Sequence, residues 1–256
     1  MKIGGYSHFN GITFFCDNFK LKGTKKKGKI EYDIEWIIPP KFLRKLENKF
    51  ILGGLSTAYY QWKVLDRKVR MVLLLLVGVY FAEDITDLSN VYYRVDQLMD
   101  PYFYYILAVI AMVLLLNYKK ILQVFRYHGA EHKAINCYIE HGHVDPYLIK
   151  KASRFNIRCG SNITGIFLLL YLPLWFLNVE SIGIIFLLFL TSIQIIKILD
   201  KKKYPWDKYV QLLQWITALE PREEELAIAV GTFNQLQKAH QLYRSKIIES
   251  RRYVPS

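Results

Sequence analysis

The sequence has little cysteine, no early apolar run and no internal repeat, and each absence argues against a class of protein. The three cysteines in 256 residues, Cys16, Cys137 and Cys159, form an odd and scattered set, so no disulfide framework is expected. The first strongly apolar run begins only at residue 71, which argues against a cleavable signal peptide. No repeat of ordinary repeat-protein length occurs, which argues against a solenoid.

Charged side chains are missing from four stretches, residues 71–82, 101–118, 159–179 and 181–196, which are 12, 18, 21 and 16 residues long. A helix needs about 20 apolar residues to cross the hydrocarbon core of a membrane, with a usual range of about 17 to 25. The third stretch meets that length alone, and the snorkelling side chains of Lys119 and Lys197 extend the second and fourth. The alternative is the core of a soluble protein, but "IFLLLYLPLWFL" is apolar on every face of a helix.

Basic residues are distributed unevenly between the loops, and their positions predict a topology. Lys and Arg outnumber Asp and Glu by 15 to 6 in residues 1–70, by 8 to 3 in 117–158 and by 11 to 7 from 197 onward, whereas residues 83–100 carry 1 against 5. Lys and Arg concentrate on cytoplasmic loops. The charge pattern therefore indicates that the short first stretch crosses too, although the sequence does not decide whether residues 71–82 cross fully. We expect a membrane α-helical protein with about four transmembrane helices in the cytoplasmic (inner) membrane, with both termini in the cytoplasm.

The remaining segments have different characters. Residues 1–38 are expected to be rich in β-structure, because "KIEYDIEWI" alternates apolar and acidic residues with the period of a half-buried strand. Residues 39–70 form an amphipathic stretch suited to the inner membrane surface. The four-span region 71–196 includes a cytoplasmic loop, 117–158. In the cytoplasmic tail, 197–256, a proline and three glutamates predict the start of a packing helix, with the glutamates as caps.

The formal net charge of +13 follows from the same topology. A basic membrane protein reflects the orientation rule and the anionic lipid at the inner surface, so the lipid bilayer is the expected partner. Nucleic-acid binding is not expected, because no stacking-plus-basic motif accompanies the lysine clusters.

The stretch "FRYHGAEHKAINCY" carries the strongest chemical motif. On a helix, His128 and His132 are four residues apart and share a face, so their imidazoles could bind one Zn²⁺ or another divalent metal. Glu131 lies beside them as a candidate catalytic base, and the order H-x-x-E-H is the one that inverted zinc proteases use. The alternative is a plain helix in which Glu131 pairs with Arg126 or Lys133.

A catalytic zinc needs a third protein ligand and an open position. Six further donors are within reach along the chain, and spacing does not select among them: Cys137, Glu140, His141, His143, Asp145 and Cys159. We take the thiols of Cys137 and Cys159 as the predicted metal ligands beside the two histidines.

The same stretch, followed by "SRFNIRCGSNITG" and "LQWITALEPREEELAIAV", resembles the YqhQ-like family of bacterial membrane proteins. The opening "GGYSHFNG" is similar to the N-terminal glycine motif of that family, so the resemblance spans nearly the whole chain. It implies an integral membrane protein with a cytoplasmic His/Glu motif and a predicted dependence on metal. It implies no substrate, because the family is a domain of unknown function.

Three sites depart from the family pattern. Asn156 and Ile157 stand where the family has His-Pro, Asn10 stands where it has glutamate, and residues 218–219 replace Thr-Arg. The lost histidine would have been a further ligand. These departures weaken the case for catalysis.

Two functions are therefore predicted. The first is a metal-binding membrane protein, with hydrolysis of a lipid-linked or membrane-peptide substrate as its activity. The second is a non-catalytic assembly or scaffold factor that docks membrane or cytoplasmic protein partners. A transporter is disfavoured because the four charge-free stretches hold no ionisable residue. The sequence does not give the oligomeric state.

Overall fold

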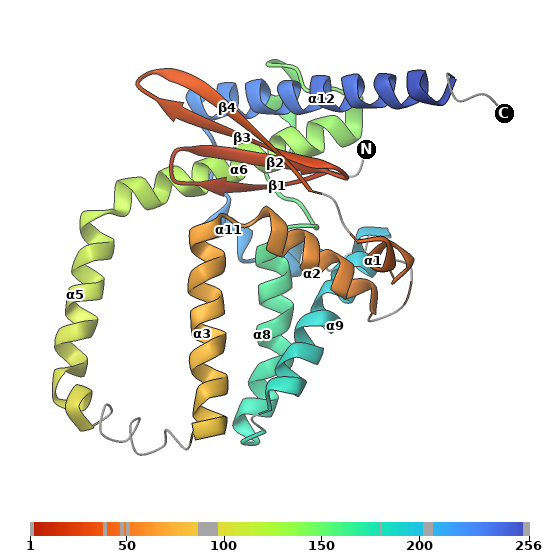
Figure 1. Cartoon of the computed structure of the whole chain (residues 1–256). Coiled ribbons are helices and arrows are strands. Elements are labelled where there is room, and N and C mark those ends of the chain that lie inside the picture. The colour runs from red at the N-terminus through yellow and green to blue at the C-terminus, as the bar shows by residue number, and fades with distance from the viewer. Residues whose placement is uncertain are drawn as a thin grey trace. The chain divides into compact units, whose positions relative to one another are not determined.

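A computed structural model of the chain describes residues 3–37, 40–46, 49, 52–86, 97–179, 181–201 and 207–252 (Figure 1). The chain divides into two compact units, residues 1–60 with 122–256, and residues 61–121. The first unit carries the β-sheet, and the second carries long apolar helices.

The first unit begins with an antiparallel meander of four strands in the order β1-β2-β3-β4. The strands are β1 (Ile3–His8), β2 (Gly11–Cys16), β3 (Phe19–Lys26) and β4 (Lys29–Trp36). Between β3 and β4, Lys27 (φ 47°) and Gly28 (φ 80°) both adopt the left-handed conformation that a two-residue type I′ turn requires. The sequence "KIEYDIEWI" forms a strand, as its alternation predicts, but the strand is not half-buried, because Tyr32, Ile34 and Trp36 are 42%, 50% and 62% exposed.

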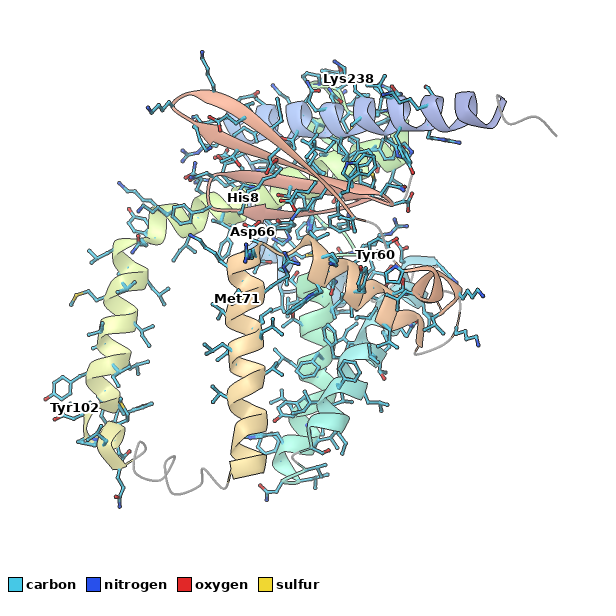
Figure 2. The ribbon with its side chains drawn as sticks, viewed as in Figure 1. His8, Tyr60, Asp66, Met71, Tyr102 and Lys238 are labelled. Atoms are coloured by element: carbon cyan, nitrogen blue, oxygen red, sulfur yellow. The ribbon has the colours of Figure 1, made fainter. Side chains whose placement is uncertain are left out.

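The helices of the first unit follow the sheet along the chain and return to it. They are α1 (Lys41–Leu46), α2 (Leu52–Val64, which continues into the second unit), α6 (Tyr118–His141, which begins in the second unit), α7 (Leu148–Lys151), α8 (Gly160–Phe176), α9 (Ile182–Lys201), α10 (Asp207–Val210), α11 (Gln214–Thr217) and α12 (Glu223–Arg252). The long helix α12 lies along the sheet, with Lys238 on the side that faces away from it (Figures 1 and 2).

The main core lies between the sheet, α6 and α12. Ile12, Phe14 and Leu21 share one face of the sheet and are at most 4% exposed. The ring of Phe14 meets Phe233 of α12 edge-on, with the ring centroids 5.2 Å apart. This core fixes the central part of α6, which carries the His–Glu motif, under the sheet.

A second, smaller cluster joins α8 and α9, which run antiparallel side by side (Figure 1). Four isoleucines form it, and each is at most 8% exposed: Ile163, Ile166, Ile193 and Ile196. The first half of α8 is therefore packed against α9.

The second unit contains α3 (Arg67–Thr86), the short 3₁₀ helix η1 (Asp100–Tyr102) and α5 (Phe103–Leu116). Every residue of α5 is exposed. Tyr102 marks one end of this helix in Figure 2, and its side chain points away from the helix axis. A helix of this composition with no buried face is unusual in water.

The prediction of four spans is wrong. Two helices of the described residues are long and apolar enough to cross a membrane, Gln97–Leu116 and Gly183–Lys201. The first charge-free stretch lies in α3, but charged residues occur inside that helix near both of its ends, so the apolar part is too short. The third charge-free stretch, residues 159–179, lies in α8. This helix has 17 residues and ends at Phe176, before Asn178, which has a left-handed backbone conformation (φ 53°). Charge-free runs therefore overstate how much of each helix is suited to a bilayer.

Candidate metal centre

The His–Glu motif lies in the buried middle of α6, where residues 129–135 are all buried. Gly129 is required there by a contact and not by the helix itself. A Cβ at this position would lie 1.9 Å from the carbonyl oxygen of Leu219, because the backbone at Leu219 packs directly against α6 here. The amide of Leu219 also donates to the carbonyl of Phe125, at 3.0 Å. The segment before α12 is thus attached directly to the motif.

The two imidazoles are oriented by backbone carbonyls from outside the helix. Nδ1 of His128 lies 2.8 Å from the carbonyl oxygen of Thr217, and Nδ1 of His132 lies 2.7 Å from that of Arg154. A carbonyl oxygen only accepts, so both Nδ1 atoms carry the proton and both Nε2 atoms keep a lone pair. The ring centroids are 4.3 Å apart. Metal-binding histidines are held in this way, with the remote nitrogen donating to a carbonyl or carboxylate.

Cys159 supplies a third donor from a different element. It is the N-cap of α8, and its Sγ accepts a hydrogen bond from the amide of Ser161 at 3.4 Å. The same sulfur lies 3.2 Å from Nε2 of His128, to which the thiol can donate. Cys159 thus lies at the start of α8 with its sulfur directed at the first imidazole.

Together, the donor atoms of His128, His132 and Cys159 lie within 4.8 Å of one another, and this cluster could hold a metal ion. Donors on one tetrahedral zinc, at bonds of about 2.0 to 2.3 Å, are separated by about 3 to 4 Å. Small side-chain movements would therefore close the set around one ion. Three protein ligands leave one coordination position open, as in catalytic zinc sites.

Glu131 lies against this cluster in a dry environment. Its side chain is 5% exposed, and Oε2 is 4.0 Å from Nε2 of His128. Burial raises the pKa of Glu131 to about 7, an effect that the nearby His128 partly offsets. Gly5 of β1 lies directly over this side chain, because a Cβ there would be 2.8 Å from Cγ of Glu131. The glycine motif at the start of the chain thus leaves room for the carboxyl.

A buried amide network holds the loop that brings Arg154 and Cys159 to α6. Gln214 of α11 accepts from the amide of Asn156 at 2.9 Å and donates to the carbonyl of the same residue at 2.8 Å. Asn162 donates to that carbonyl too, at 3.1 Å, and accepts from Gln214 at 2.7 Å. The loop is therefore fixed between the start of α8 and the segment that carries Thr217.

Of the predicted site residues, the structure brings together His128, Glu131, His132 and Cys159. Cys137 is buried elsewhere, with its Sγ 3.5 Å from the carbonyl oxygen of His143, and burial raises the pKa of its thiol. It is not part of the cluster found among the described residues.

The other donors of the predicted set also lie outside the cluster. Nδ1 of His143 is 3.0 Å from the carbonyl of His141, on the exposed end of α6. Asp145 accepts from the amide of Tyr147 at 2.7 Å and so begins the turn into α7.

Of the two alternative partners predicted for Glu131, Arg126 and Lys133, the second is engaged elsewhere, and Glu225 of α12 has a structural role. Lys133 donates to the carbonyl of Lys150 at 2.9 Å and pairs with Glu220 at 2.8 Å. Glu225 accepts from the amide of Arg222 at 2.8 Å, which confirms its role as a cap.

Thr217 belongs to the motif residues that this chain shares with the family it resembles, but its role at His128 was not predicted. Arg154 and Gln214 were not predicted as parts of the site. Thr217 and Arg154 act through backbone carbonyls, which leave no mark in the sequence.

Comparisons with known proteins agree with these motifs. A family model described as "Protein of unknown function (DUF1385)" matches residues 57–239. The chain is 30% identical over 156 residues to "Uncharacterized protein YqhQ" of Bacillus subtilis (strain 168), a match that covers 53% of this chain and 49% of that protein. The chain thus matches about half the length of this curated relative. No solved structure matches the chain significantly.

Proposed function

The chain belongs to the DUF1385 family of proteins of unknown function, and from that premise we propose that it is a membrane-associated, zinc-dependent hydrolase. The observation that carries this proposal is the set of three donors of His128, His132 and Cys159 within 4.8 Å of one another. Both imidazoles in this set are already in the tautomer that a metal needs.

The chemistry of the donors fits zinc better than the other common divalent ions. Imidazole and thiolate ligands favour zinc, whereas manganese and magnesium favour carboxylate and water oxygens. His128, His132 and Cys159 would hold the ion. Bound zinc would supply Lewis acidity for hydrolysis at neutral pH.

Glu131 is the general base in this proposal. Its pKa of about 7 lies near the working pH, which is where a group that takes and returns a proton is most effective. Its carboxyl is close to the cluster without being one of the three donors, since Oε2 is 4.0 Å from Nε2 of His128. The carboxyl can therefore accept a proton from a substrate water at the site and pass it to a leaving group.

Two features support membrane association. The helices Gln97–Leu116 and Gly183–Lys201 have the length and composition to cross a bilayer. Aromatic residues also mark both ends of α5, with Tyr104 and Tyr105 in its first turn and Tyr118 just after its last. A substrate at the membrane surface, lipid-linked or a membrane peptide, would suit this setting.

The proposal is tested by the metal content of the full-length protein purified in detergent. About one zinc per chain is expected for the wild type, and His132→Ala should lose it because two donors cannot hold the ion. His141→Ala is the matched control, since this histidine lies on the exposed end of the same helix. Equal zinc in His132→Ala and wild type, or no metal in either, would remove the proposal.

A structural metal in a scaffold protein is the second candidate, and the burial of the site favours it. His132 is 2% and Cys159 8% exposed, which is typical of closed sites. The two candidates differ in the fourth coordination position. With Co²⁺ in place of zinc, acetohydroxamate should change the visible spectrum of an open site and leave that of a closed one unchanged.

A further inference from the structure

Each imidazole of the metal centre depends on a carbonyl from a separate part of the chain. Thr217 holds His128 and Arg154 holds His132. These two carbonyls are 63 positions apart in the sequence, so local chain geometry does not fix their spacing. Something must hold the two segments at a constant separation if both Nε2 atoms are to point at one ion.

The amide network of Gln214 and Asn156 makes one such connection, and the side chain of Arg154 makes a second one directly beside the two orienting carbonyls. Its Nη1 donates to the carbonyl of Ala218 at 2.7 Å, and Ala218 directly follows the residue that orients His128. One residue therefore orients His132 with its backbone and holds the segment that orients His128 with its side chain. A guanidinium presents several donors in a rigid plane, which suits such a bridge.

The surroundings keep this guanidinium in place. It lies over the ring of Phe155, 4.9 Å from the centroid, and 5.8 Å from the centroid of Trp215. Nε is 3.9 Å from the carboxylate of Glu220, and the arginine side chain is only 20% exposed. Trp215 belongs to α11, so the stacking and the hydrogen bond both attach Arg154 to the segment of Thr217.

We propose that Arg154 is a positioning residue that aligns both imidazoles toward one metal ion. This inference rests on the proposed zinc site. Cys159 is held by a second connection, the amide network of Gln214 and Asn156, which also joins the loop to α11 but does not involve the guanidinium. Loss of the guanidinium should therefore disturb the two imidazoles and leave the thiolate in place.

The test compares Arg154→Gln with Arg154→Lys and with Arg158→Gln in the detergent-purified full chain. Arg158 is the matched control, because it lies on the same loop and its Nε donates to Asp200 at 2.7 Å, away from the imidazoles. Competition with a chromophoric chelator should show about 10- to 100-fold weaker Zn²⁺ binding for Arg154→Gln, which is the usual effect of losing an outer partner of a ligand. Arg154→Lys should recover part of the affinity, since an ammonium can still donate to the carbonyl of Ala218.

Cobalt substitution gives a readout that a general loss of stability would not produce. In Arg154→Gln, the thiolate-to-cobalt charge-transfer band should persist while the ligand-field bands shift. Wild-type Zn²⁺ affinity and an unchanged cobalt spectrum in Arg154→Gln would overturn the inference. Equal losses in Arg154→Gln and Arg158→Gln would overturn it too.

A metal-free measurement separates this inference from the proposed function. Imidazole ¹⁵N shifts of the metal-free wild type should show the Nδ1–H tautomer for His128 and His132, and Arg154→Gln should show mixed tautomers. If the wild type binds no zinc but the tautomers change in this way, the zinc proposal fails and the positioning role stands. Unchanged tautomers in Arg154→Gln would remove the positioning role whatever the metal result.

Discussion

Helices α5 and α6 follow one another in the chain and reverse the usual relation between polarity and burial. α5 is apolar along its length and exposes every residue, whereas α6 buries a glutamate, a histidine and a lysine. If water were the only solvent, the apolar helix would be the buried one. The contrast is the one expected of a chain with lipid as well as water around it, and it supports the proposed membrane association.

The polar residues of α6 are buried because other segments supply their partners. The buried Lys133 is paired with Glu220, and the half-buried Asn136 donates to the carbonyls of Ser153 and Phe155 at 2.8 and 2.9 Å. A buried polar group without a partner would cost about 1 to 3 kcal/mol. Burial in α6 is thus specified by bonds to particular residues, whereas the exposure of α5 requires only an apolar surface. Substitutions should therefore have different effects in the two regions.

The largest difference in the free energy of unfolding is expected between Gly→Ala substitutions at two helical glycines. Gly129→Ala would drive a methyl group into the carbonyl of Leu219, at 1.9 Å, so the backbone before α12 must move. A loss of about 3 kcal/mol or more in the free energy of unfolding is expected, at the upper end for overpacked sites. Gly78→Ala in α3 meets nothing within 4 Å and should gain up to about 1 kcal/mol from helix propensity.

Thermal unfolding of both variants in the same detergent measures this difference. A Gly129→Ala protein as stable as the wild type would show that the segment around Leu219 is not held against α6. The contrast between α6, which is held by specific contacts, and the exposed apolar helices would then lose its main support.

The elements with a regular pattern could be predicted from the sequence. The alternation in residues 30–36 predicted β4, and the four-residue spacing of His128 and His132 predicted that they share a helix face. Glu131 followed from the same motif. These features are local, and their periods are visible in the letters of the sequence.

The rest of the site depends on loops and on backbone atoms. Cys137 and Cys159 were equal candidates by composition, and only the path of the chain from α7 to α8 decides which thiol meets the histidines. The carbonyls of Thr217 and Arg154 have no signature, since every residue carries one. The number of spans was overestimated because counting charge-free residues ignores where the helix itself begins and ends.

A second prediction compares two exposed leucines. Leu107 of α5 is 52% exposed and Leu242 of α12 is 66% exposed, so in water both would accept lysine at little cost. If lipid surrounds α5, Leu107→Lys should cost about 3 kcal/mol of membrane insertion, whereas Leu242→Lys should stay within about 0.5 kcal/mol. The fraction of protein that resists alkaline extraction from membranes measures the effect. Equal retention of both variants would show that α5 does not lie in lipid.

The last prediction concerns the buried side of the comparison, at Glu131. Its folded-state pKa of about 7 lies above the ordinary value of 4.5, so the folded protein favours the protonated form. The metal-free wild type should therefore lose stability as pH rises from 4.5 through 7, with no penalty below 4.5 and the full penalty above 7. A shift of this size corresponds to about 3 kcal/mol.

Glu131→Gln removes the ionisable group and should flatten that profile, so it should be more stable than the wild type at pH 8 and similar at pH 4. Chemical unfolding with a chelator present, across this pH range, is the measurement. Glu140→Gln is the control, because this glutamate is exposed on the same helix and should leave the profile unchanged. If the free energy of unfolding of Glu131→Gln and of the wild type changed with pH in parallel, water would have to reach the carboxyl of Glu131. The polar face of α6 would then be solvated and not buried.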